Sequence, residues 1–169
     1  LIAATMVAKY AGIIVLSDFQ GESLFPLLVE RLNIYTDPQR PMMMQQGIYP
    51  LGNPAEDSPV LITTNFSLTY FIVSGEIESS RVPSWLLVMD TEGLSVLTAW
   101  AAGKFVGDAI GALAEKSGIT DKVKHRKVVI PGAVAAISGD LEEELGSGWE
   151  VKIGPREAAH IPAYLKMGA

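Results

Sequence analysis

Four segments of this chain repeat one order, in which a short apolar strand leads into a polar or glycine-rich loop and then into a helix. The strands are predicted over 60–64, 85–90, 127–131 and 149–153, and the helices over 67–79, 95–117, 134–145 and 156–166. This alternation is typical of an α/β fold with an open, mostly parallel, Rossmann-like or flavodoxin-like sheet and helices on both faces. Ligands of such sheets bind beyond the carboxyl ends of the strands, so the loops are the predicted site.

The first 58 residues follow a different pattern. Gly12–Asp18 is predicted as a strand and Glu22–Leu32 as a helix, and a start without methionine, inside a helical pattern, indicates a fragment of a longer protein. Residues 37–58 are rich in Pro, Gly, Gln and Met, which predicts a linker without a regular element. Within it, Met42–Met44 offer either soft metal ligands or a flexible apolar contact with a neighbouring domain, and the second interpretation is favoured.

Composition excludes several classes of function. A net charge of -6 argues against nucleic acid and anionic membrane surfaces as partners. No apolar run approaches the roughly 20 residues of a membrane span. A mean hydropathy of +0.27 therefore predicts apolar surface that covers a partner or a large ligand. Without cysteine, these residues form no disulfide, thiolate zinc site or iron–sulfur cluster.

The loop from Thr63 to Ser67 offers hydroxyls, an amide and backbone N–H groups at the start of a helix, which suits polar ligand groups. Helix capping by Asn65 or Ser67 is the alternative for the same loop. In the next loop, Gly93 permits close backbone approach and Ser95 is a candidate cap. Residues 93–98 are mostly small or apolar, which suits a large macrocycle better than acid–base catalysis. No nucleophile elbow, GxGxxG or GxxxxGK[ST] motif follows any strand, which disfavours a lipase-like or nucleotide-binding domain.

These loops resemble a known family. TTNFSLTY, VSGEIESSRVPSWLLVMDTEG, SVLTAWAAGKF, HRKVVIPG, SGDLEEEL and GPREAAHIP are similar to the C-terminal corrinoid-binding domain of the large, or gamma, subunit of the corrinoid iron–sulfur protein, from the acetyl-CoA synthase/decarbonylase system. The resemblance runs from Pro59 to Lys166. It implies that residues 1–36 end a TIM-barrel domain with its last βα unit, that 37–58 are a linker, and that 59–169 are the corrinoid-binding domain.

The resemblance implies a cytoplasmic methyl carrier of anaerobes. Its cofactor would be a cobamide, either cobalamin or 5-methoxybenzimidazolylcobamide, held base-off, with an iron–sulfur cluster only in an N-terminal domain outside this chain. The methyl group would pass from methyltetrahydrofolate, or a pterin analogue, to acetyl-CoA synthase. Implied partners are a small TIM-barrel subunit in a heterodimer, the methyltetrahydrofolate methyltransferase, acetyl-CoA synthase/CO dehydrogenase and an ATP-dependent reductive activator.

The residues expected to contact the cofactor come from four loops and the helices that follow them. They are Thr63, Thr64, Asn65, Ser67, Tyr70, Gly93, Leu94, Ser95, Val96, Leu97, Thr98, Gly132, Ala133, Val134, Gly154, Arg156 and Glu157. No residue is expected to be catalytic or to ligate the metal strongly. Neither His125 nor His160 lies in a DxHxxG motif, so Thr98 is the candidate for the residue that faces the lower side of cobalt.

A second interpretation remains open at this point. An α/β module that only docks subunits, without a cofactor, would share the fold and the apolar surface. Colour separates the two, since a protein that binds a corrinoid is orange to pink, one that binds a flavin is yellow, and a docking module is colourless.

Overall fold

A computed structural model describes residues 2–35 and 42–168, which belong to two compact units, 1–41 and 42–169. In the first unit the structure contains α1 (Ile2–Ala8) and α2 (Gly21–Tyr35). The predicted helix is confirmed as part of α2, whereas the predicted strand Gly12–Asp18 is wrong, because this segment has no regular structure. No other strand exists among residues 2–35 to supply the hydrogen bonds that an extended segment needs. Membership of a TIM barrel stays a prediction.

The second unit is built on a five-stranded sheet in the order β1-β3-β2-β4-β5. Its strands are β1 (Gly47–Leu51), β2 (Val60–Thr64), β3 (Ser84–Met89), β4 (Lys127–Ile130) and β5 (Glu150–Ile153). Strands β2 to β5 pair in parallel and β1 pairs antiparallel with β3, which confirms the α/β prediction of an open, mostly parallel sheet. The predicted strands match β2 to β5 within one residue at either end.

Strand β1 lies inside the predicted linker, so the expectation that this segment forms no regular element is wrong. Pro50 is tolerated there because β1 is an edge strand, where a missing N–H breaks no ladder on the outer side. Residues 37–41 of the predicted linker lie outside the described residues. The methionines are also engaged, because Met43 forms a bridge with Phe66 and the Met44 N–H donates to the Asn65 carbonyl oxygen at 2.8 Å.

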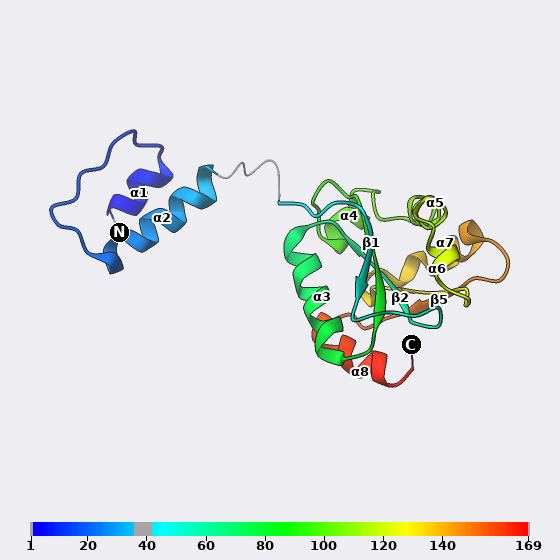
Figure 1. Cartoon of the computed structure of the whole chain (residues 1–169). Coiled ribbons are helices and arrows are strands. Elements are labelled where there is room, and N and C mark those ends of the chain that lie inside the picture. Colours follow the sequence, from blue (N-terminus) through cyan, green and yellow to red (C-terminus); the bar gives the residue numbers. More distant parts are fainter. Residues whose placement is uncertain (1, 36–41, 169) are drawn as a thin grey trace. The chain divides into compact units, whose positions relative to one another are not determined.

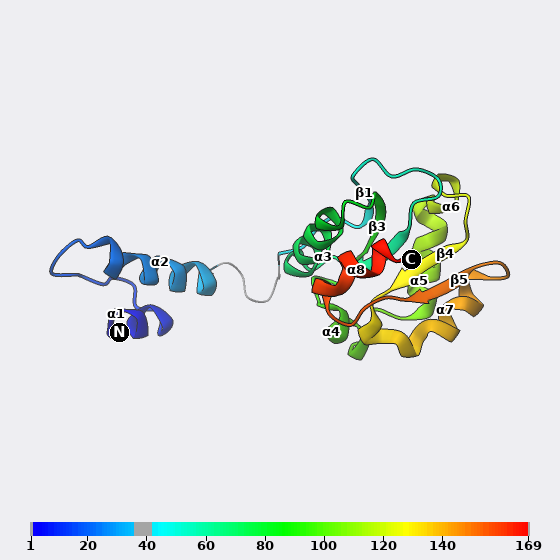
Figure 2. The same cartoon turned by 90° about the horizontal axis from the view of Figure 1, so that it is seen from below.

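Helices cover both faces of the sheet, as Figures 1 and 2 show. On one face α3 (Ser67–Ser80) and α8 (Ile161–Lys166) pack over Leu61, Leu86 and Val129. The opposite face carries the larger core, around Ile62, Leu87 and Phe105. That face is covered by α4 (Val96–Ala101), α5 (Gly107–Ser117), α6 (Ile119–Lys122) and α7 (Ser138–Leu145). Among the described residues, no helix combines the length and the apolar character needed to cross a membrane.

Three predicted helices are interrupted. The segment 95–117 divides into α4 and α5 because Gly103 adopts a left-handed φ of 70° and Phe105 then turns into the core, where it is fully buried. The segment 134–145 consists of a 3-10 helix, η1 (Gly132–Ile137), followed by α7. The last helix begins later than predicted, with η2 (Ala158–His160) and then α8, and Pro162 rather than Pro155 occupies the early helical position.

Candidate functional site

The strand order creates a crevice at one defined place. Strand β2 lies between β3, which follows it in the chain, and β4, which comes later, so the crossovers from β2 and β3 leave in opposite directions. Open α/β sheets bind ligands at this topological switch point, beyond the carboxyl ends of the strands. Here the loops after β2 and β4 diverge, and the structure has a pocket of about 170 Å³ beside them.

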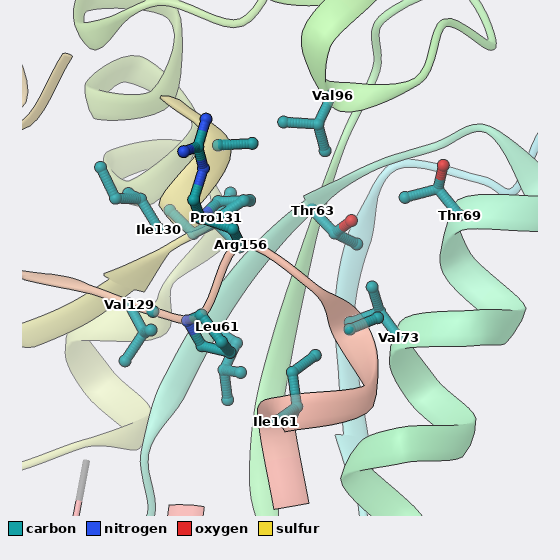
Figure 3. A pocket seen from close by; sticks show the side chains of 15 residues that line it. Leu61, Thr63, Thr69, Val73, Val96, Val129, Ile130, Pro131, Arg156 and Ile161 are labelled. Atoms are coloured by element: carbon teal, nitrogen blue, oxygen red, sulfur yellow. The ribbon is translucent and has the colours of Figure 1, made fainter. Parts of the chain in front are cut away.

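The pocket lies between the sheet and the two helices α3 and α8 (Figure 3). Leu61 and Val129 line it from the sheet, Val73 from α3 and Ile161 from α8. Val96, at the start of α4, lines it from the other side. The lining is almost entirely apolar, and Arg156 is the charged residue among the described residues that line it.

One polar atom inside this apolar lining has no partner. Thr63 is 1% exposed, and its Oγ1 makes no hydrogen bond among the described residues. A buried hydroxyl without a partner costs about 1–3 kcal/mol, so native structures retain few of them. Thr63 also lines the pocket, so its buried hydroxyl lies next to the space that a bound molecule would occupy. Thr64 Oγ1 is also unpartnered, but Thr64 does not line the pocket.

The loops after β2 and β3, residues 65–67 and 90–95, are joined by buried hydrogen bonds, and we call them the first loop pair. Asn65 Oδ1 accepts hydrogen bonds from the backbone N–H groups of Thr91 at 3.0 Å and Gly93 at 3.1 Å. Asn65 Nδ2 donates to Asp90 Oδ1 at 2.9 Å. Gly93 has a φ of 73°, which is accessible to glycine at little cost. The side chain of Asn65 is thus used within the protein.

The alternative for the loop 63–67, capping of α3 by Asn65 or Ser67, is wrong. The N-cap of α3 is Phe66, without a side-chain cap, and the Ser67 N–H donates to the Met42 carbonyl oxygen at 3.0 Å. That N–H is therefore not free for a ligand. Ser95 is the N-cap of α4, yet its hydroxyl lies 3.1 Å from Thr98 Oγ1 rather than on a backbone N–H.

The loops after β4 and β5, residues 131–134 and 154–157, form the second loop pair and meet through their backbones. The Gly132 N–H donates to the Pro155 carbonyl oxygen at 3.1 Å, and the Gly154 N–H donates to the Ile130 carbonyl oxygen at 2.9 Å. A Cβ on Gly132 would overlap the carbonyl oxygen of Gly154 and lie 2.9 Å from the Pro155 carbonyl carbon. Gly132 is therefore required for the approach of the two loops.

The structure places the predicted site residues in three groups. Those that line the pocket are Thr63, Val96, Ala133, Gly154 and Arg156. Those that are buried away from its lining are Thr64, Asn65, Ser67, Tyr70, Gly93 and Val134; those that are partly or largely exposed outside the lining are Leu94, Ser95, Leu97, Thr98, Gly132 and Glu157. Several apolar lining residues were not anticipated, namely Leu61, Val73, Val129 and Ile161. Strand alternation places Leu61 and Val129 on the face of the sheet that α3 and α8 cover once the sheet order is known, whereas Val73 and Ile161 lie on the helices α3 and α8.

Tyr70 belongs to the core beneath β1. Its ring lies 5.1 Å from that of Tyr49, centroid to centroid, and burial raises the pKa of its hydroxyl, with smaller contributions from Tyr49 and Glu78. The Tyr49 hydroxyl donates to the Gln45 carbonyl oxygen at 2.7 Å. Tyr70 therefore supports the segment that leads into β1 rather than the pocket.

Neither histidine lines the pocket. His125 Nδ1 accepts the Lys127 N–H at 3.2 Å, which leaves Nε2 to donate to the Ser58 carbonyl oxygen at 2.9 Å, at the amino end of β4. His160 is exposed at the end of η2. Among the described residues, no three His, Cys, Asp or Glu side chains gather in a way that could hold a metal ion.

Comparisons with known proteins give one consistent family. Residues 2–165 match the family model described as CO dehydrogenase/acetyl-CoA synthase delta subunit. The chain is 50% identical to the corrinoid/iron–sulfur protein large subunit of Moorella thermoacetica over 97% of this chain and 36% of the relative. It is 43% identical to the acetyl-CoA decarbonylase/synthase complex subunit gamma of Methanopyrus kandleri over 98% of this chain and 35% of that protein. The chain spans about a third of the length of these relatives.

Proposed function

The chain belongs to the family of CO dehydrogenase/acetyl-CoA synthase subunits that includes the corrinoid/iron–sulfur protein large subunits, and on that premise we propose that it holds a cobamide at the carboxyl edge of its sheet. The observation that carries this proposal is the apolar pocket at the switch point, with the buried, unpartnered Thr63 hydroxyl next to it. A relative named as a corrinoid protein supports the choice of ligand class.

Pocket size indicates which part of a cobamide would enter. Pockets that enclose a whole small molecule measure roughly 300–1,000 Å³, whereas this one measures about 170 Å³. A corrin macrocycle is too large for that space, but a flat aromatic base is not. We infer that the nucleotide tail occupies the pocket, with its aromatic faces against Leu61, Val73 and Ile161 and a polar atom at Thr63 Oγ1. This arrangement corresponds to a base-off cobamide, since the tail base cannot lie in the pocket and on the metal together.

The macrocycle would then rest on the exposed rim of the pocket. Leu97 and Trp100 on α4 are 54% and 42% exposed, so they offer apolar surface on which the ring could rest. Arg156, the charged lining residue, is suited to the phosphate of the nucleotide tail, because a guanidinium binds phosphate oxygens in pairs. Thr98 is exposed on the same helix as Leu97, and we propose that it faces the lower side of the ring.

When bound, the cobamide supplies a metal centre that can accept and release a methyl group. The residues of this chain orient it, exclude water from the tail and offer no strong donor to the lower face. We propose that the protein acts as a methyl carrier, with methyltetrahydrofolate or a pterin analogue as the donor and acetyl-CoA synthase as the acceptor. The small TIM-barrel subunit, the methyltransferase and the reductive activator are proposed as its partners, and the iron–sulfur cluster is proposed to lie in a part of the protein outside this chain.

Visible absorption of the protein, mixed with its proposed small subunit and reconstituted with cobalamin, tests this proposal. The Co(II) band is compared with base-on and base-off standards. A bound, base-off spectrum supports both the ligand and the site of its tail. A bound, base-on spectrum would retain the carrier and reject the tail pocket. A colourless protein after desalting would favour the docking module instead.

A further inference from the structure

We propose that Asn65 is a positioning residue, which fixes α4 relative to the floor of the pocket and so sets the surroundings of the lower face of the cobamide. This inference rests on the proposed function. Asn65 is 3% exposed and does not line the pocket, so it makes no contact with a molecule held there. Its influence has to pass through the residues it binds.

The hydrogen bonds of Asn65 require an amide. Oδ1 accepts from two backbone N–H groups, those of Thr91 and Gly93, and the Thr91 hydroxyl lies 3.1 Å from the same oxygen. Nδ2 donates to Asp90 Oδ1, which also accepts the Glu92 N–H at 2.9 Å. Aspartate would keep the acceptor but would lose the donor and place a second carboxylate beside Asp90. No other side chain of this length offers both groups.

These bonds connect two walls of the pocket that are far apart in sequence. Thr63 lies two residues before Asn65 on β2, and Val96 lies three residues after Gly93 at the start of α4. The Thr91 hydroxyl lies 2.9 Å from the Leu94 carbonyl oxygen, which fixes the last turn before α4. The side chain of Asn65 therefore sets the distance between the pocket floor at Thr63 and the pocket wall at Val96.

A purely structural role for Asn65 would lower stability without a specific effect on the cofactor, so the test needs a matched control. Ser80 is 2% exposed at the other end of α3, where its hydroxyl donates to the Ile77 carbonyl oxygen at 2.6 Å and accepts the Val82 N–H at 3.0 Å. Ser80→Ala removes one buried and one partly buried hydrogen bond at the C-terminal end of α3, near the amino end of β3. Asn65→Ala removes all the side-chain hydrogen bonds that join the two loops, whereas Asn65→Asp keeps an oxygen that can accept from Thr91 and Gly93 but loses the donor to Asp90.

The first measurement needs no cofactor. Amide hydrogen exchange in the intact protein should accelerate by about tenfold or more at Thr91 and Gly93 in Asn65→Ala, because their N–H groups lose their acceptor. In Asn65→Asp the same amides should stay protected. Ser80→Ala should leave both unchanged while lowering the unfolding midpoint. Unchanged protection in Asn65→Ala would overturn the proposal at this step.

The second measurement uses cobalamin. Asn65→Ala should raise the Kd for cobalamin, by about tenfold if roughly one molecule in ten keeps the two pocket walls correctly placed, and should shift the Co(II) band and its midpoint potential. Asn65→Asp should shift the same quantities less, and it carries the test if Asn65→Ala does not fold. Equal cobalamin affinity and potential in Asn65 and Ser80 variants of equal stability would show a structural role only. Failure of the unsubstituted protein to bind cobalamin would reject the proposed function itself. Tight binding by every variant would instead keep the proposed function and reject the positioning role of Asn65.

Discussion

The two loop pairs at the carboxyl edge of the sheet are held together in different ways. Side-chain hydrogen bonds from Asn65 join the first pair, and its polar groups are satisfied within the protein. Close backbone contact at Gly132 and Gly154 joins the second pair, with little side chain between the loops. The pocket lies beside the second pair, and Thr63 and Val96, which flank the first pair, also line it; there Thr63 keeps an unpartnered hydroxyl. Polar residues near the site therefore have two uses: some, such as Asn65, hold the loops together, and others, such as Thr63, keep a polar group without a partner in the protein.

The largest effect is expected where the second pair is disrupted. Gly132→Val should lower the free energy of unfolding by about 3 kcal/mol or more, because the added Cβ overlaps the backbone of Gly154. Denaturant unfolding measures the change. Gly139→Ala is the matched control, because no atom lies within 4 Å of a Cβ at that position.

The next effect separates a residue left for the ligand from one that builds the site. Thr63→Val removes a buried hydroxyl that has no partner, so the protein without cofactor should become more stable by about 1 kcal/mol. Binding of cobalamin should weaken by about tenfold, since the ligand loses its hydrogen bond. Thermal unfolding and equilibrium titration give the two values. A loss of stability in the free protein would mean that the Thr63 hydroxyl has an internal partner and would reject its role in the pocket.

A third substitution tests α4, the helix that follows the first pair. Thr98 is exposed on α4, with its hydroxyl 3.1 Å from Ser95 Oγ. Thr98→His should leave the stability nearly unchanged, since the site is exposed, and should give the cobamide a lower imidazole donor. The Co(II) absorption should then resemble a ligated standard, and reduction should need a more negative potential, because axial ligation stabilises the higher oxidation states. An unchanged spectrum and potential would remove Thr98 from the lower face.

The sequence predicted the central strands well because β2 to β4 are buried apolar runs, which polar or glycine-rich loops terminate. It did not predict β1, since an edge strand with Pro50 lacks the usual pattern. It also did not predict the break at Gly103, because the residues on either side suit a helix and only the position of Phe105 in the core requires the turn.

The sequence located the polar residues of the loops correctly, but it did not show which of them face the pocket and which bind other parts of the protein. The sequence predicts that Asn65 touches the ligand. In the structure, parallel pairing of Thr64 with Met89 brings Asn65 beside Asp90, and its amide is hydrogen-bonded within the protein. The apolar lining from Val73 and Ile161 depends on how α3 and α8 pack over the sheet. That packing is a tertiary property, and the sequence pattern alone does not determine it.

The smallest effect concerns charges at the amino ends of β4 and β5, the strands that lead into the second pair. On β5 a hydrogen bond from Lys152 is the main cause that lowers the pKa of Glu150 below its ordinary 4.5, and Lys127 contributes further. A carboxyl with a lowered pKa stabilises the fold above its ordinary pKa, and that contribution is lost as the pH falls through the lowered value. Glu150 and its partners are exposed, so the loss should be slight.

The unfolding midpoint of the unsubstituted protein, compared with that of Lys152→Met between pH 6 and pH 3, measures this contribution. The two curves should differ only slightly near neutral pH and should converge in acid. If backbone contact holds the second pair, as Gly132 and Gly154 indicate, amide exchange at Gly154 should stay slow throughout this range. Early exchange at Gly154 in acid would mean that charge on β5, rather than close backbone packing, holds the loops together.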